Sequence, residues 1–168
     1  MLPKNPPHAR DIMTRNPVTL DPHTSLYDAS KLLLKRNWLS APVLGDDGKF
    51  LGTFSQQSCM HALVDAMYDE IPSTEVQAYL DPNPFITHED ATLMKCCQFF
   101  TDTTRRGPSL VVLRGDELCG LITRSDIIRS VLKLLKTAPD RKTRLLYLSA
   151  LNKMEETPGR MRDSAGTS

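Results

Sequence analysis

The sequence predicts an α+β fold made of two tandem units, each with the order strand, helix, strand, strand, helix (βαββα). One observation is an internal repeat, because Asn16-Pro17 recurs in the second half of the chain as Asn83-Pro84. Gly52 likewise recurs as Gly120, at nearly the same spacing. The second observation is size, since a unit of about 60 residues is too small for a comfortable core of its own. Two units packed sheet to sheet would bury both apolar faces.

The first unit begins with a strand that tolerates Pro17 at its start. The spacing of apolar residues then predicts a helix, with Thr24 as its N-cap. The Gly-Asp-Asp-Gly turn at 45–48 is a strong hairpin signal between two strands. Pro72 is expected to end the last helix of the unit. The predicted elements are a strand at 16–20, a helix at 26–36, strands at 38–44 and 49–54, and a helix from 55 to about 70.

The second unit repeats this order after Asn83-Pro84. A polar turn containing Gly115 separates its two hairpin strands. The final helix is indicated by apolar residues at helical spacing, for which Thr123 and Ser125 are both possible caps, with Asp126 in or beside the first turn. The predicted elements are a strand at 85–87, a helix at 92–101, strands at 110–113 and 118–122, and a helix through 127–135.

The junction between the last strand and the last helix suggests chemistry as well as structure. Thr123 and Asp126 bring a hydroxyl and a carboxylate, three residues apart, to a helix N-terminus. A carboxylate can accept two hydrogen bonds from a vicinal diol such as a ribose. Arg124 and the helix N-terminus favour an anion nearby. Because Thr-x-x-Asp is also a common helix-capping pattern, a plain cap is the alternative explanation.

The stretch from Gly120 to Asp126, Gly-Leu-Ile-Thr-Arg-Ser-Asp, resembles the core motif of CBS domains, Gly-hydrophobic-hydrophobic-Thr-x-x-Asp. The resemblance covers roughly residues 9–136 as a tandem CBS pair, often called a Bateman module. It implies two units packed about an approximate two-fold axis, with a cleft on each side. It also implies that the Thr and the Asp hold the ribose of an adenine nucleotide. Modules of this kind usually pair again into a flat homodimer.

The resemblance implies further contacts in the second cleft. A strand supplies backbone contacts to the adenine, apolar residues wall the base, and a basic residue meets phosphate. These roles map to Phe85, Ile86 and Thr87 for the adenine, Leu110 and Ile122 for the wall, and Arg105 or Arg106 for the phosphate. The first unit departs from the motif, with Ser55 at the Thr position and Ser58 at the Asp position. The ligand is therefore expected mainly in the second cleft.

Five segments are predicted along the chain. They are a flexible N-terminus at 1–8, CBS domain 1 at 9–72, CBS domain 2 at 73–136, a C-terminal helix at 137–154 and a disordered tail at 155–168. The C-terminal helix is expected to pack on the module or on a partner subunit. A membrane-surface role for this helix is poorly supported, because it carries only four basic residues.

The composition argues against several classes of protein. The 21 Lys+Arg balance 20 Asp+Glu, so no general attraction to nucleic acid is expected. No window approaches the ~20 apolar residues of a membrane helix, and the start lacks an apolar core of signal-peptide length. The four Cys form no C-x-x-C pair, which favours structural thiols in a cytoplasmic protein. The four His form no zinc motif, and no hydrolase or nucleotide-loop motif appears, so neither an enzyme nor a metal site is predicted.

Together these observations predict a stand-alone regulatory module. An AMP-, ADP- or ATP-like nucleotide would act as its regulatory ligand, with no required cofactor, and the module would signal to an unidentified protein effector. A homodimer is expected, with no nucleic-acid or membrane partner. The alternative function is a ligand-free dimerising scaffold or interaction module. A DNA-binding regulator is disfavoured, because no helix-turn-helix is evident outside the repeat.

Overall fold

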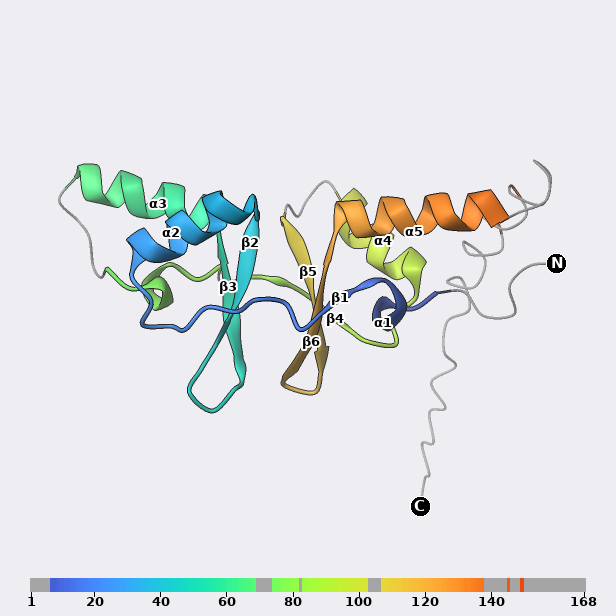
Figure 1. The fold of residues 1–168 in the computed structure, drawn as a ribbon, viewed down its shortest axis with the longest axis horizontal. Coiled ribbons are helices and arrows are strands. Elements are labelled where there is room, and N and C mark those ends of the chain that lie inside the picture. The colour runs from blue at the N-terminus through green and yellow to red at the C-terminus, as the bar shows by residue number, and fades with distance from the viewer. Residues whose placement is uncertain are drawn as a thin grey trace, which may run out of the picture.

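The computed structural model describes residues 7–68, 74–81, 83–102 and 107–137, together with Leu145 and Ser149. Within these ranges the chain forms two similar halves that lie side by side (Figure 1). The elements of the first half are α1 (Ala9–Ile12), β1 (Thr14–Arg15), α2 (Leu26–Arg36), β2 (Ser40–Leu44), β3 (Phe50–Ser55) and α3 (Gln56–Met67). Those of the second half are the 3-10 helix η1 (Val76–Tyr79), β4 (Phe85–His88), α4 (Leu93–Thr101), β5 (Ser109–Arg114), β6 (Glu117–Thr123) and α5 (Arg124–Thr137). The predicted α+β fold of two tandem repeats is confirmed.

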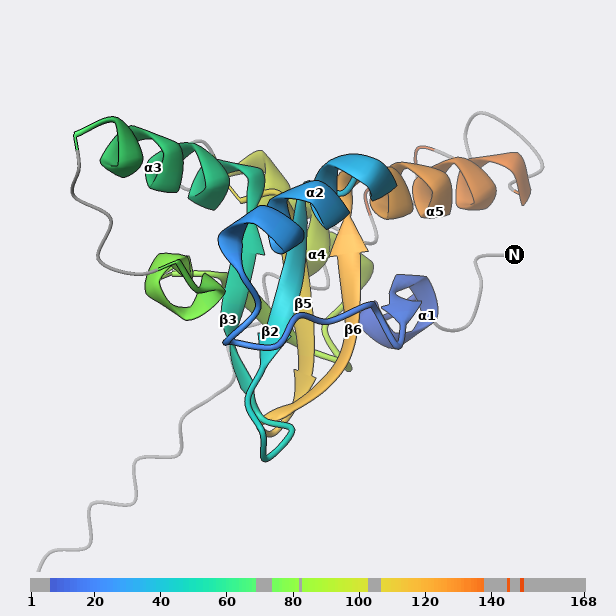
Figure 2. The same ribbon diagram turned by 60° about the vertical axis from the view of Figure 1, so that its left-hand side comes forward.

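The strands form two sheets near the centre of the molecule, and the helices lie on the outside (Figure 1). A two-stranded sheet contains β2 and β3, which pair antiparallel. A four-stranded sheet has the order β1-β6-β5-β4, in which only β4 and β5 are parallel. Its outer strand β1 belongs to the first half of the chain. In Figure 2 the segment after α1 runs from beside β6 across to α2.

The two halves exchange the segments that lead into them. The N-terminal segment is bonded to the turn before α4, because Ala9 N–H donates to Ala91 O at 2.7 Å and Leu93 N–H donates to Pro7 O at 2.9 Å. The linker is bonded in the same way to the turn before α2. There Leu26 N–H donates to Thr74 O at 2.8 Å, and the amide of Val76 donates to the carbonyl of Thr24 at 3.0 Å. Each half is therefore completed by residues that precede the other.

Each half has its own hydrophobic core between its sheet and its helices. Leu33 of α2 packs with Phe54 of β3 in the first core, and both are fully buried. Leu93 of α4 and Ile122 of β6 are equally buried in the second. Burying each such side chain contributes roughly 1.5–3 kcal/mol. The second core also contains Ala9 of α1, so the exchanged N-terminal segment is part of it.

A third buried layer lies where the two sheets face each other. Side chains alternate between the two faces of a strand. Pro42 and Val111, which are flanked by residues of the two cores, therefore point away from those cores, yet both are fully buried. Ser40 and Ser109 occupy equivalent repeat positions, and their hydroxyl oxygens lie 2.6 Å apart in a buried hydrogen bond. This contact joins β2 to β5 close to the approximate two-fold axis.

Some predicted element boundaries are wrong for local reasons. The strand expected at 16–20 is reduced to a single bridge between Leu20 and Val43, because Asn16 has a left-handed φ of 49° and Pro17 has no N–H. The N-cap of α2 is Ser25, whose Oγ accepts from the amide of Asp28 at 3.1 Å, and not Thr24.

Several predicted segments fall largely outside the part of the chain that the structure describes. The helix expected to reach about residue 70 ends at Met67, and residues 69–73 are not described. Of the predicted C-terminal helix at 137–154, Thr137, which ends α5, Leu145 and Ser149 are described, and all three are helical. The predicted tail lies wholly outside the described residues, as does the N-terminus apart from residues 7 and 8. None of the described helices is long and apolar enough to cross a membrane.

Candidate functional site

The second junction, Thr123 to Asp126, places a carboxylate at the first turn of α5. Both Thr123 donors point to one carboxylate oxygen of Asp126: the backbone N–H lies 2.9 Å from Oδ2 and the side-chain Oγ1 lies 2.7 Å from it. The bond from Thr123 N–H to the Asp126 carboxylate is one arm of a capping box, and the two bonds hold the carboxylate in a fixed orientation. The plain-cap explanation thus accounts for one oxygen of Asp126. Whether the same carboxylate also binds a ligand depends on its second oxygen.

The second oxygen of Asp126, Oδ1, is bonded to a side chain on the surface of α5. Arg129, one turn along the helix, donates from Nη1 to Asp126 Oδ1 at 2.9 Å. The Asp126 side chain is only 12% exposed, whereas the Arg129 side chain is 74% exposed. The carboxylate is therefore well fixed, but its charged partner is largely in solvent.

The first junction, Ser55 to Ser58, builds the same shape without a charge. Ser58 N–H donates to Ser55 Oγ at 3.1 Å, and Ser55 N–H donates to Ser58 Oγ at 3.2 Å. The two hydroxyl oxygens are 3.2 Å apart, and both residues are buried. A pair of serines thus caps α3 with a complete capping box. The predicted difference in charge between the junctions lies at one position, which is Ser58 in the first and Asp126 in the second.

The predicted wall residues lie together but are buried. Phe85 on β4 pairs with Leu110 on β5, and Leu110 pairs with Ile122 on β6, so the three form a row across the sheet. All three belong to the second core, where Leu110 and Ile122 have no exposed surface. Their role as ligand contacts stays a prediction.

The other predicted contacts are scattered. Ile86 is exposed and Thr87 is buried, and both line a cavity of about 360 Å³ with Lys95 and Phe99 of α4, away from Thr123 and Asp126. Arg124 is exposed, and its guanidinium lies 5.1 Å from the centre of the Phe100 ring. Arg105 and Arg106 lie outside the described residues.

A second cavity, of about 260 Å³, lies between the two halves. Its lining includes two pairs of equivalent repeat positions, Leu39 with Pro108 and Gln56 with Arg124, so it sits on the approximate two-fold axis. Ser55 of the first junction lines this cavity, and so does Arg124 of the second junction. Thr123 and Asp126 are not among its lining residues.

Sequence reasoning missed the strand beside the second junction. Thr14 pairs with Leu121 and Arg15 pairs with Gly120, so β1 lies next to the last residues before Thr123. The approach is close, because a Cβ on Gly120 would lie 2.8 Å from the backbone oxygen of Thr14. A glycine inside a strand often marks such an approach, and this was the available signal.

The remaining reactive side chains have structural environments. Burial raises the pKa of the Cys96 thiol to about 12, which leaves it protonated and unreactive at neutral pH. Arg114 forms a two-pronged ion pair with Glu89, at 2.6 and 2.7 Å, and this pair holds the pKa of the Glu89 carboxyl below its usual value. Among the described residues, no group of three or more His, Cys, Asp or Glu could hold a metal ion.

Comparison with known proteins matches both halves of the chain. The family model described as CBS domain matches residues 9–65 and again residues 76–133. Among curated proteins, an A-adding tRNA nucleotidyltransferase of Aquifex aeolicus is 27% identical over 123 residues, and a zinc metalloprotease of Methanocaldococcus jannaschii is 28% identical over 134 residues. The matched regions cover 73% and 79% of this chain. They span only 14% and 35% of the length of those relatives.

Solved structures of CBS pairs share the fold. CBSX2, a CBS-pair protein of Arabidopsis thaliana crystallised with AMP, is 23% identical with a TM-score of 0.66, covering 76% of this chain and 97% of that one. A CBS domain pair crystallised with 5′-methylthioadenosine and S-adenosyl-L-methionine is 21% identical with a TM-score of 0.62. That match covers 74% of this chain and 95% of the other.

Proposed function

The chain belongs to the CBS domain family, and on that premise we propose that it is a regulatory module that binds an adenosine-containing nucleotide at the second junction and signals to a protein effector. The observation that carries the proposal is the charge difference between two junctions of the same shape. Serine hydroxyls are enough to cap α3. The carboxylate of Asp126 supplies hydrogen-bond acceptors beyond those that the cap of α5 uses.

The ligands of the related structures support an adenosine ligand. AMP, 5′-methylthioadenosine and S-adenosyl-L-methionine differ in what is attached to the 5′ carbon, but each contains a ribose with two neighbouring hydroxyl groups. Oδ1 of Asp126, whose protein partner Arg129 is largely exposed, is a suitable acceptor for these hydroxyls. We assign the ribose to Asp126 and Thr123 on this chemistry.

We assign the phosphate end to the cavity between the halves. Arg124 follows Thr123 directly and lines that cavity, so a ligand held at Asp126 can reach it. At about 260 Å³ the cavity is smaller than the ~300–1,000 Å³ of typical ligand pockets, and it would take only part of a nucleotide. Arg106, Phe85, Ile86, Thr87, Leu110 and Ile122 stay proposed contacts for the same ligand.

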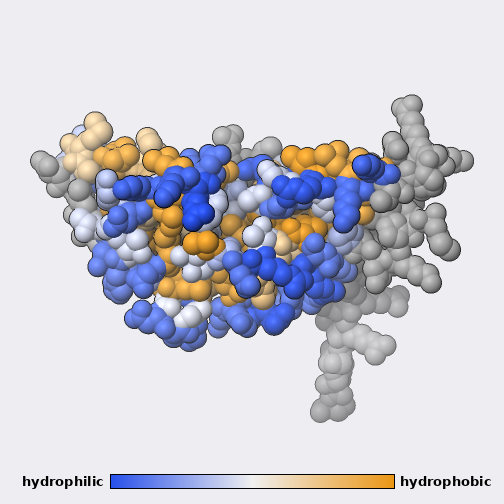
Figure 3. Space-filling view, in the orientation of Figure 1, coloured by the Kyte–Doolittle hydropathy of each residue, from blue (hydrophilic) through white to orange (hydrophobic). Residues whose placement is uncertain are grey.

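We also propose that two copies of the chain pair through the helices that follow the two junctions. Exposed apolar residues occur at equivalent repeat positions, Met60 and Val64 on α3 and Ile128 and Leu132 on α5. Figure 3 shows apolar surface along the edge of the molecule that carries these helices. The α3 and α5 helices are related by the internal two-fold axis. A second copy of the chain, turned by a two-fold rotation, would therefore place its own apolar residues of α3 and α5 against those of the first copy. Such a self-complementary patch suits a homodimer.

Isothermal titration calorimetry tests the proposed ligand. The purified full-length chain is titrated with AMP, ADP, ATP and S-adenosyl-L-methionine. We expect one nucleotide to bind per chain. Two equal sites per chain would contradict the difference between the junctions. Absence of binding by every one of these ligands would overturn the nucleotide function and favour the alternative, a ligand-free dimerising scaffold.

Light scattering at micromolar concentration tests the homodimer. We expect the mass of two chains for the parent protein and of one chain for Leu132→Glu, since a carboxylate would be placed in an apolar contact. Lys133→Glu is the control, because it produces a larger change in charge at the neighbouring residue, which is not one of the exposed apolar residues. A monomeric parent would rule out both the homodimer and the alternative function as a dimerising scaffold.

We propose that the protein is located in the cytoplasm, because its four cysteines are all free thiols.

A further inference from the structure

The acceptor capacity of Asp126 is nearly used up. A carboxylate has about four lone-pair positions, two on each oxygen. Thr123 takes both positions of Oδ2 through its N–H and its hydroxyl. Arg129 takes one position of Oδ1. A single position is left for a ligand, whereas the ribose of an adenine nucleotide offers two hydroxyl donors.

From this count we propose that Arg129 is a gating residue for the second junction: its guanidinium occupies an acceptor position that the ribose diol needs, and it swings away when the ligand binds. The inference rests on the proposed function, because it describes competition for the same carboxylate. Arg129 is a positioning residue here, since it acts on Asp126 and not on the ligand.

The two partners of Asp126 differ in how easily they can leave. Thr123 is fixed at the end of β6, where it pairs in register with Ser109. The Arg129 side chain is 74% exposed, so its guanidinium can be solvated as soon as it lets go. Exposed ion pairs between residues one helical turn apart are weak. A ligand can therefore displace Arg129 and leave the Thr123 contacts unchanged.

The first junction has no counterpart of this pair. Ser58 stands at the repeat position equivalent to Asp126, and His61 stands at the position equivalent to Arg129. Ser58 forms its hydrogen bonds with Ser55. Gating by an arginine is thus a feature of the junction that carries the carboxylate.

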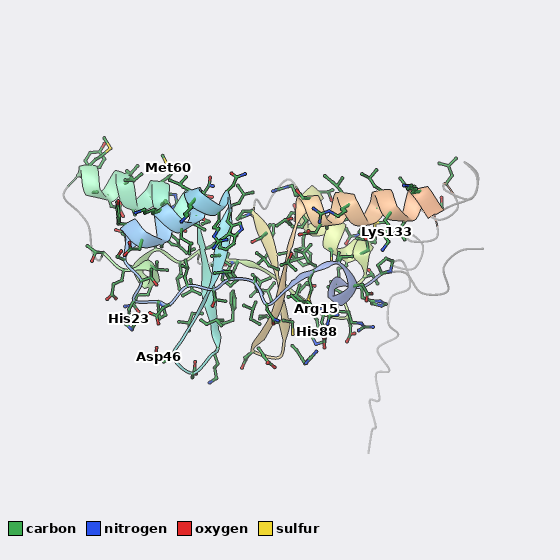
Figure 4. All side chains as sticks on the ribbon, in the orientation of Figure 1. Arg15, His23, Asp46, Met60, His88 and Lys133 are labelled. Carbon is green, nitrogen blue, oxygen red and sulfur yellow. The ribbon has the colours of Figure 1, made fainter. Side chains whose placement is uncertain are left out.

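The test is calorimetry with adenosine, which has the ribose but no phosphate. An arginine near the site would also attract phosphate, and a nucleoside removes that effect. We expect Arg129→Met to bind adenosine about two- to five-fold more tightly than the parent, the range that an exposed ion pair accounts for. Lys133→Met is the matched control, because Lys133 is an exposed residue one turn further along α5 (Figure 4), and it should leave the affinity unchanged.

A double variant separates competition from indirect effects. In an Asp126→Asn background the ion pair is already lost, so adding Arg129→Met should change adenosine affinity by less than about 1.5-fold. Unchanged or weaker adenosine binding by Arg129→Met in the parent background would overturn the gate. A parent that binds no adenosine and no adenine nucleotide would instead overturn the proposed function. Circular dichroism of each variant checks that α5 is intact.

Discussion

The two junctions of this molecule have the same backbone shape and different chemistry. At Ser55–Ser58 two hydroxyls and two amides are bonded to one another, and no charge is present. At Thr123–Asp126 one carboxylate oxygen accepts both bonds from Thr123, and the other is bonded to the exposed Arg129. The comparison teaches that the fold requires only a neutral cap at this position. A carboxylate there is extra, and extra acceptors at a fixed position are what a ligand site needs.

The two halves also differ in how they are completed. The first half has a two-stranded sheet, and among the described residues its counterpart of β1 is seen in the hydrogen bond from Asp81 N–H to Thr53 O at 2.8 Å. In the second half β1 pairs with β6 and extends the sheet to four strands. The strand that carries the charged junction is therefore the more strongly supported one.

The largest effect is expected from removing the charge at the second junction. Asp126→Asn should weaken AMP binding about ten-fold or more, because charge-assisted hydrogen bonds are each worth roughly 1.5–3 kcal/mol. The melting temperature without ligand should move little, since an asparagine oxygen still accepts from Thr123. Ser58→Ala is the matched variant and should not affect AMP affinity. Equal losses from both variants would remove the distinction between the junctions.

The support of the second junction is tested at Gly120. A Cβ there would lie 2.6 Å from Met13 Sδ and 2.8 Å from the backbone oxygen of Thr14, so β1 has to move away from β6. We expect Gly120→Ala to lower the free energy of unfolding by about 1–3 kcal/mol, as overpacking does. Denaturant unfolding measures it. If the stability were unchanged, β1 would not be packed against β6 in solution.

A gain of function sharpens the comparison. Ser58→Asp places a carboxylate where Ser55 N–H and Oγ already point, next to the cavity between the halves. The helix N-terminus of α3 favours the charge, typically by about 0.3–1 kcal/mol. Calorimetry should then show a second, weaker AMP site per chain. Ser58→Asn, of similar size but neutral, should not create one. One site per chain in both variants would mean that the carboxylate alone is not enough.

The smallest effect concerns the two exchanged segments. His23 and Glu75 tie the linker to the first half, with His23 Nδ1 3.1 Å from Glu75 Oε2. The hydrogen bond and the negative charge of Glu75 raise the pKa of His23 above its usual 6.5. The same hydrogen bond and the charge of His23 lower the pKa of Glu75.

The sign of the pH dependence follows from these shifts. A raised histidine pKa gives stability that is fully present below about pH 6.5 and is lost as the pH rises through the folded-state pKa of His23. The lowered Glu75 pKa gives stability that is lost only in stronger acid, below its usual value of 4.5. Hydrogen exchange of amides 74–77 should therefore be slower at pH 5.5 than at pH 8, after correction for intrinsic rates. His23→Gln should abolish the difference, and a difference that persists would assign it to another group.

The second half offers the matching control for this pH effect. There the N-terminal segment is held by an ion pair between Arg10 and Asp90, and His88 also lies 3.5 Å from Asp90 and His8 3.9 Å from Asp11. Any pH dependence of this segment comes from its own groups, so it should be the same in the parent and in His23→Gln. Exchange of the Ala9 amide, which donates to Ala91, should not share the dependence that His23 confers.

Much of the fold could be predicted from the sequence, because its signals are local. The repeat, the hairpin turn at 45–48 and the Thr92 cap of α4 depend on spacing and on turn and cap chemistry within a few residues. The Thr-x-x-Asp motif of the second junction is local in the same way. The pairing of Arg129 with Asp126 was also open to prediction, since residues three apart on a helix lie on one face.

The pairings between distant segments were decided only by the tertiary structure. Thr24 and Ser25 are both able to cap α2; Ser25 does so, and the carbonyl of Thr24 accepts from Val76 in the linker. Neither the exchange of β1 onto β6 nor the hydrogen bond between Ser40 and Ser109 leaves a periodic pattern, because each partner is chosen by burial among residues far away in the chain. The sequence by itself determined the elements and the charge of each junction; the packing of one half on the other determined what those junctions lie against.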